Sequence, residues 1–230
     1  MGLCDLPRDV IEHMLVHFGG AREAASLART CGDLGATVMG RPGEQGILCR
    51  EDDVLPVGIG SVGGVVTIPG VLRVTREVRV RAGVHLTIRG GRVENTLGGV
   101  AGVEGGFDNA FVVDRGGSLV LEAVRVVGAG VKVCGGGTAR LVGCDVQDAP
   151  LCGVLVHDRG SRVEVAGGSV SGSKEYDGIS AEEGGHAVVK GVQISNCARY
   201  GLCRADDDSR VEVGEGVTVR GCGLGDRHGC

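Results

Sequence analysis

The sequence predicts a mainly β protein, in which a parallel β-helix follows a small α-helical module. Three observations support this. A phrase of alternating apolar residues and glycine turns recurs with a nearly constant period from about residue 71 onward. Each period has room for short strands but not for a crossover helix, which needs about a dozen residues. The first 40 residues have fewer glycines and a helical apolar period.

The helical module is expected to cover residues 1–40. Pro7 suits a first helical turn, where its missing N–H costs nothing, and Gly19-Gly20 ends the helix. A second amphipathic helix is expected over residues 22–31. In the first helix the apolar residues recur at the spacing of one helix face: Val10, Ile11, Met14, Leu15 and Phe18.

Residues 41–70 are expected to form a linker and then a cap over the first coil of the β-helix. The stretch around Pro42 is polar and rich in turn residues. The stretch from Ile47 to Val66 is apolar and glycine-rich without clear alternation. A cap is needed because an open first coil would expose its apolar end.

The β-helix is expected to occupy residues 71–230. Its repeats close on apolar residues whose successive gaps are 33, 20, 24, 24 and 25 residues. The longest gap holds a glycine-rich stretch from Leu97 to Asn109, which we expect to loop out of one coil. A near-fixed period in the low twenties is typical of a solenoid. The closing residues are Val93, Val126, Val146, Val170, Ile194 and Val219.

Two further apolar runs in each repeat make three short strands per coil, which predicts a three-sided β-helix. Successive coils would then lie about 4.8 Å apart. One set of runs begins at Leu119, Ala139, Val163, Ala187 and Val211. The other set begins at Phe111, Val131, Val154, Ile179 and Leu202. Alternate residues face outward and are expected to be solvated, among them Arg162, Glu164, Arg210 and Glu212.

Composition argues against several function classes. The net charge is −5 and no basic patch stands out, so we expect no nucleic-acid partner. No stretch approaches the roughly 18 apolar residues of a membrane span, and no secretory signal is recognisable. The ten cysteines are expected to be mostly reduced core residues.

Carboxylates are the candidates for chemistry, because sugar-cleaving enzymes use two of them about 5 to 9.5 Å apart. Asp158, Glu182 and Asp206 follow the same strand in successive coils, so we expect them to share one corner. A solvated turn edge is the preferred interpretation, and a Ca²⁺ site is an alternative. The candidates are Asp145, Asp148, Asp158, Asp177, Glu182, Glu183, Asp206, Asp207 and Asp208.

No metal or cofactor is expected. Cys197 with Cys203, or Cys222 with His228 and Cys230, could hold Zn²⁺, but neither set has the tight paired spacing of a zinc motif. Cys197 and Cys222 fall at equivalent repeat positions, so we expect them to stack in the core.

The N-terminal segment resembles an F-box. The resemblance rests on residues 6–15, which open with Leu-Pro and continue as a helix of paired apolar positions, and on residues 25–31, which contain Leu-Ala and end in Cys. F-boxes dock on the Skp adaptor of cullin ubiquitin ligases. The resemblance therefore implies a Skp-binding surface made of Leu6, Pro7, Val10, Ile11, Met14, Leu15 and Leu27.

The repeats resemble the pectin-lyase-like right-handed parallel β-helix, and the combination is similar to F-box proteins that carry such repeats. The resemblance implies an intracellular substrate adaptor, in the cytoplasm or nucleus, that holds a target protein for ubiquitin transfer. Such a protein needs no catalytic residue of its own. Two alternatives stay open: a β-helix polysaccharide lyase or hydrolase, and a structural or viral β-helix protein whose N-terminal helices only cap one end.

Overall fold

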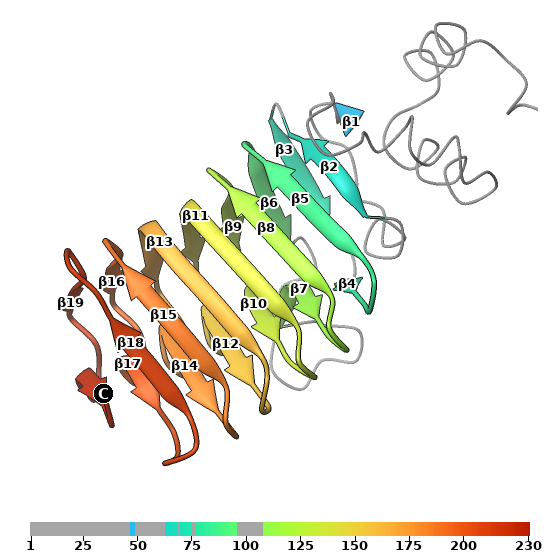
Figure 1. Cartoon of the computed structure of the whole chain (residues 1–230). Helices are drawn as coiled ribbons and strands as arrows, with labels where there is room; N and C mark the ends of the chain where they lie inside the picture. Colours follow the sequence, from blue (N-terminus) through green and yellow to red (C-terminus); the bar gives the residue numbers. More distant parts are fainter. Residues whose placement is uncertain (1–46, 49–62, 69, 75–76, 96–107) are drawn as a thin grey trace, which may run out of the picture.

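A computed structural model describes residues 47–48, 63–68, 70–74, 77–95 and 108–230. Within these residues the protein is mainly β and forms a parallel β-solenoid, drawn as a stack of strands in Figure 1. The expected helical module of residues 1–40 lies outside the described residues, as does most of the stretch expected to loop out of one coil.

The solenoid has three faces, each a stack of parallel strands. The first face contains β1 (Ile47–Leu48), β2 (Gly64–Thr67), β5 (His85–Arg89), β8 (Ser118–Glu122), β11 (Thr138–Gln147), β13 (Arg162–Ser171), β15 (His186–Lys190) and β18 (Arg210–Val213). The second face contains β3 (Val71–Val74), β6 (Arg92–Asn95), β9 (Arg125–Val127), β16 (Gln193–Ser195) and β19 (Thr218–Arg220). The third face contains β4 (Val78–Val80), β7 (Asn109–Val113), β10 (Gly130–Val133), β12 (Val154–His157), β14 (Ile179–Glu182), β17 (Tyr200–Arg204) and β20 (Gly225–His228).

The long strands β11 and β13 run from the first face into the second and join the two in one 13-stranded sheet. The third face is a separate sheet of seven strands, from β4 to β20. The chain makes about six turns between these two end strands. Strands β1 and β2 already pair in the first face, within the segment assigned above to the linker and cap.

The register confirms the repeat pattern of the sequence. Val93 pairs with Val126, and the same column continues through Val146, Val170, Ile194 and Val219. The runs that begin at Leu119 and at Phe111 form the corresponding columns of the first and third faces. Three short strands per repeat, stacked in parallel, are therefore the building unit of the described chain.

The core is a narrow aliphatic column. Side chains alternate along each strand, so one set points inward and packs on its equivalents in the coils above and below. Leu121, Leu141 and Val165 are almost fully buried, and Phe111 is the largest buried side chain. Burial of one such side chain contributes about 1.5–3 kcal/mol relative to exposure. The outward-facing Arg162 and Arg210 are exposed, and Glu164 and Glu212 are half-buried.

The bend between the first and second faces depends on glycine. Gly168 lies within β13 with a φ of +78°, a conformation that L-residues avoid. A Cβ at this position would overlap the carbonyl oxygen of Cys144 in the preceding coil. Only glycine fits both the backbone conformation and the space.

Cys197 and Cys222 occupy equivalent places on successive coils, as the sequence predicted. The N–H of Gly223 donates to the carbonyl of Cys197 at 2.9 Å, and Ala198 donates in the same way to Ser173 one coil earlier, at 2.8 Å. Cys197 is buried and Cys222 is half-buried, and both are free thiols. Burial raises the pKa of Cys197 to about 11, so it is an inert core residue at neutral pH.

Candidate functional site

The outer side of the third face carries a groove of about 270 Å³. Its floor is formed by the outward side chains of Val112, Lys132 and Leu155, which are register neighbours on β7, β10 and β12. The remaining lining residues are Glu77, Arg79, Asp108, Asn109, Cys134, Leu151 and Cys152. The groove therefore crosses several coils and follows the long axis of the solenoid.

Charges of both signs line this groove. Arg79 pairs with Glu77 at 2.6 Å and with Asp114 at 3.6 Å, and Lys132 and Asp108 add one charge of each sign. A uniformly anionic polymer such as an acidic polysaccharide is better matched by a cationic lining. An apolar centre with a polar rim is typical of surfaces that bind protein.

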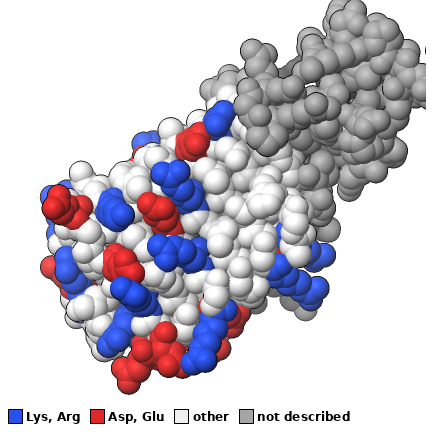
Figure 2. Space-filling model, viewed as in Figure 1, with Lys and Arg blue, Asp and Glu red and all other residues white. Residues whose placement is uncertain are grey.

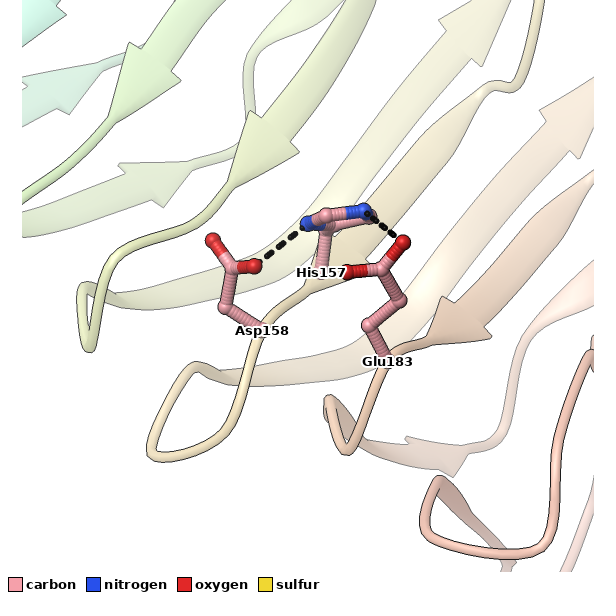
Figure 3. A group of neighbouring side chains, drawn as sticks. All are labelled: His157, Asp158 and Glu183. Carbon is pink, nitrogen blue, oxygen red and sulfur yellow. Dashed lines mark ion pairs between the residues drawn. The ribbon is translucent and has the colours of Figure 1, made fainter.

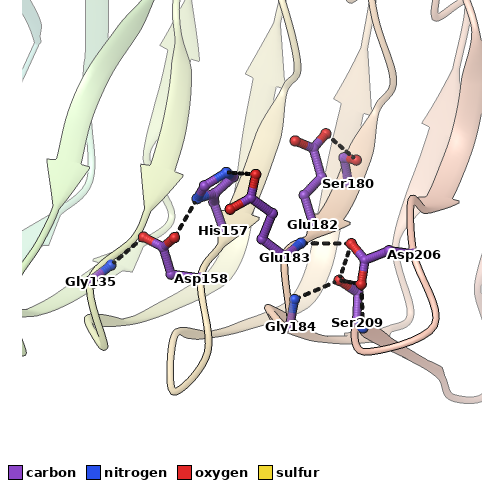
Figure 4. Close-up of polar contacts among 9 residues, drawn as sticks. All are labelled: Gly135, His157, Asp158, Ser180, Glu182, Glu183, Gly184, Asp206 and Ser209. Carbon is purple, nitrogen blue, oxygen red and sulfur yellow. Dashed lines mark hydrogen bonds and ion pairs between the residues drawn. The ribbon is translucent and has the colours of Figure 1, made fainter.

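The expected acidic corner lies where each third-face strand turns into the next first-face strand (Figure 4). Asp158, Glu182 and Asp206 lie at this one corner as expected, but Glu182 is one residue out of register with the two aspartates. His157 is the register partner of Glu182, so Glu183 is the equivalent of Asp158. The reason is uneven spacing on this face: Val154 and Ile179 are 25 residues apart, whereas Ile179 and Leu202 are 23 apart.

Asp158 is a structural acceptor at this corner. Its Oδ2 accepts a hydrogen bond from the N–H of Gly135 in the preceding coil at 3.0 Å. Three residues later, the hydroxyl of Ser161 accepts from the N–H of Gly136, also at 3.0 Å. The hydrogen bond from Gly135 lowers the pKa of Asp158, with His157 adding to the effect. The aspartate and the serine together hold the turn of the coil before them.

The same arrangement returns two coils later. Asp206 accepts from the N–H of Glu183 at 2.6 Å, and the Ser209 hydroxyl accepts from the N–H of Gly184 at 3.0 Å. Partial desolvation raises the pKa of Asp206, but hydrogen bonds from Ser209 and Glu183 outweigh it and the pKa is lowered. The two aspartates lie at a turn edge, as expected, and each also accepts a hydrogen bond from a backbone N–H of the preceding coil.

His157 lies between two carboxylates at this corner (Figure 3). Its Nδ1 is 2.8 Å from Oδ1 of Asp158, and its Nε2 is 3.3 Å from Oε1 of Glu183 in the next coil. The three ligand-type atoms all lie within 4.8 Å of one another. Among the residues that the structure describes, this is the one group of three or more His, Cys, Asp or Glu side chains with spacing suited to a metal ion.

A second histidine has different neighbours. His186, on the first face, has its Nδ1 2.8 Å from a guanidinium nitrogen of Arg162 and its Nε2 2.9 Å from Glu212. It belongs to a surface on which Lys and Arg alternate with Asp and Glu, and Figure 2 shows this mixture without a large area of one sign. Ion pairs such as Arg140 with Glu164, at 3.7 Å, run between adjacent coils there.

Two other candidate carboxylates, Asp145 and Asp177, are engaged away from this corner. Asp145 accepts from Ser169 at 2.6 Å, with Arg125 3.5 Å away. Asp177 is buried and accepts from the N–H of Tyr200 at 2.9 Å.

The proposed zinc sets are not assembled. Cys197 packs in the core, whereas Cys203 follows core residue Leu202 and points the opposite way from β17. His228 stacks on the ring of Tyr200 at a centroid distance of 4.8 Å. The residues expected to contact Skp lie outside the described part of the chain: Leu6, Pro7, Val10, Ile11, Met14, Leu15 and Leu27.

Three features of the site were not predicted from the sequence. The clamp of Asp158 and Ser161 and that of Asp206 and Ser209 share the pattern Asp-x-x-Ser, which is visible in the sequence. The groove and the grouping of His157 with Glu183 depend on the register between coils, for which a single strand carries no signal.

No family model, curated protein or solved structure matches the chain. The described residues thus define a class of fold, the parallel β-solenoid, and leave function to be argued from the site. Across those residues, no helix combines the length and the apolar character that crossing a bilayer requires.

Proposed function

We propose that the protein is an interaction protein, and specifically a substrate adaptor of a Skp–cullin ubiquitin ligase. In this proposal the F-box-like residues 6–31 dock on Skp, and the solenoid binds the target protein through the groove of its third face. Catalysis then belongs to the partners.

The groove is the observation that carries the proposal. Its floor combines the apolar side chains of Val112 and Leu155 with Lys132, and further charges of both signs line its sides, which suits an extended protein segment. The groove is built on hydrogen-bonded strands that are already ordered. Binding a partner there therefore costs little conformational entropy of the solenoid. The F-box half of the proposal rests on the Leu-Pro opening and the helix pattern of the sequence.

A sugar-cleaving function has less support. The carboxylates that the sequence suggested for it, Asp158 and Asp206, each accept hydrogen bonds from backbone N–H groups. An acid–base pair requires carboxyl groups free to face the scissile bond. We also propose a right-handed sense of winding, because connections between parallel strands are right-handed in about 98% of cases.

Co-purification of the intact protein with a Skp adaptor tests the first half of the proposal. The wild-type chain is expected to retain Skp, and a variant with Leu6→Ala and Pro7→Ala is expected to lose it. Absence of Skp binding by the intact wild-type protein would sink the adaptor function.

Groove variants test the second half. Lys132→Glu with Leu155→Asp changes the floor of the groove without touching the core. This variant is expected to keep Skp and lose a target protein that co-purifies with the wild-type chain. Arg140→Glu, on the first face, is the matched control and should lose neither. Loss of the target in both variants, or in neither, would contradict target binding in the groove.

A further inference from the structure

The contacts of His157 are asymmetric. The distance of 2.8 Å between Nδ1 and Asp158 is that of a good hydrogen bond, whereas 3.3 Å between Nε2 and Glu183 is longer than the usual range. Asp158 is itself fixed by the N–H of Gly135 at 3.0 Å. The imidazole is therefore oriented by Asp158, and its Nε2 points at a carboxylate oxygen of the next coil.

This orientation leaves a place for a cation. When Nδ1 carries the proton that Asp158 accepts, Nε2 presents a lone pair to the anionic Oε1 of Glu183. Two ligands bound to zinc at about 2.0–2.1 Å with a tetrahedral angle lie roughly 3.3–3.4 Å apart. The observed separation of 3.3 Å between these two atoms matches that geometry.

We propose that His157 and Glu183 bind a divalent transition-metal ion of the zinc class, with Asp158 as the residue that positions the imidazole. Imidazole nitrogen with carboxylate oxygen favours zinc, copper or nickel over calcium or magnesium. A carboxylate that accepts the second ring N–H of a metal-bound histidine is a common outer partner. The site is open, because His157 is 26% and Glu183 is 71% exposed, so water completes the coordination.

The two ligands come from adjacent coils, which gives the site a structural consequence. His157 ends β12, and Glu183 follows β14 directly, one register step further on. An ion held between them binds the folded solenoid and not the unfolded chain, so it raises the melting temperature. It would join two coils at the corner next to the turn held by Asp158 and Ser161.

His186 is the matched control within the same chain. It also stands beside a carboxylate, with Glu212 2.9 Å from its Nε2. The guanidinium of Arg162 lies 2.8 Å from its other nitrogen and opposes a second cation. The structure therefore distinguishes two half-buried histidines: both ring nitrogens of His157 face carboxylates, whereas one ring nitrogen of His186 faces a guanidinium.

Zinc titration of the full-length, reduced and metal-free protein tests the site by calorimetry and by the change in melting temperature. Wild type and His186→Ala are expected to bind one ion that His157→Ala and Glu183→Gln do not bind. Asp158→Asn keeps an acceptor for Gly135 and is expected to weaken zinc binding by about 10- to 100-fold.

Cobalt distinguishes this site from sites built on cysteine elsewhere in the chain. The ion bound at His157 is expected to show d–d absorption that His157→Ala removes, without change in any thiolate charge-transfer band. Variants that melt like the wild type without metal are folded, so their loss of binding is local. The proposal is overturned if wild type binds no zinc, or if His157→Ala or Glu183→Gln binds it as tightly as wild type.

Discussion

An interior coil and the last coil of the solenoid are built from the same residue types and differ in burial. Val163 and Val165 on β13 are almost fully buried, whereas their register equivalents on β18, Val211 and Val213, are only partly buried. The strands of the interior coil have a neighbour on each side, and those of the last coil have one. The difference shows that a coil obtains its core from its neighbours, as expected for a solenoid.

The largest effect is expected at a glycine bend. Gly168→Ala, in the interior, is expected to lower the free energy of unfolding by about 2–5 kcal/mol, because overpacking adds to a left-handed backbone. Gly216, in the last coil, has a similar φ of +72°, but a Cβ at this position would lie 3.3 Å from its nearest neighbouring atom. Gly216→Ala therefore adds less crowding than Gly168→Ala. It should cost about 1–2 kcal/mol. Chemical denaturation of both variants measures the loss in the free energy of unfolding. Equal losses in the two variants would contradict the tighter packing of the interior coil.

A valine in the same column measures the interior against the end directly. Val165→Ala is expected to cost about 2 kcal/mol, because two buried methyl groups are lost and a cavity remains. Val213→Ala should cost less than about 1 kcal/mol, since its side chain is already partly solvated. Thermal and urea unfolding report the difference, and a larger loss at Val213 would mean that the last coil is covered in solution.

The two corner clamps test whether an interior turn and the turn into the last coil respond alike to acid. The lowered pKa of Asp158 and of Asp206 means that each stabilises the fold above the ordinary aspartate pKa of about 3.9. This stability is lost as the pH falls through the folded-state pKa. Melting temperatures of the single variants Asp158→Asn and Asp206→Asn should each differ from that of wild type at pH 7 and converge with it below about pH 4. A constant difference down to pH 3 would argue against the clamps.

The smallest expected effect concerns the reactivity of two equivalent thiols, one in an interior coil and one in the last coil. Cys197 is buried with a pKa of about 11 because of desolvation, and Cys222, one coil later, is half-buried. Iodoacetamide at pH 8 is expected to modify Cys222 well before Cys197, as read by mass spectrometry of peptides. Equal rates would mean that the last coil opens and closes together with the interior.

The columns of the core could be predicted from sequence because translation by one repeat places like residues on top of one another. Val126, Val170 and Ile194 were recognisable as one column from spacing alone, and the register confirms it. The packing that buries them is local to adjacent coils, so no long-range information was needed.

The corner could not be predicted to the residue. A 24-residue count from Asp158 selects Glu182, whereas the register between the coils makes its neighbour Glu183 the equivalent of Asp158. The partnership of His157 with Glu183 follows from that same step. The groove is also lined by residues 108–109 and 151–152, whose sequence carries no periodic signal for such a site.

The constant register of β13 with β15 has a consequence for the gain or loss of whole repeats in evolution. Arg162 and His186 are exact equivalents 24 residues apart. Excision of one such unit, or its duplication in the gene, would reunite surfaces that already match and expose nothing new. The solenoid could thus lengthen or shorten along its axis by whole coils while its two end coils stay unchanged.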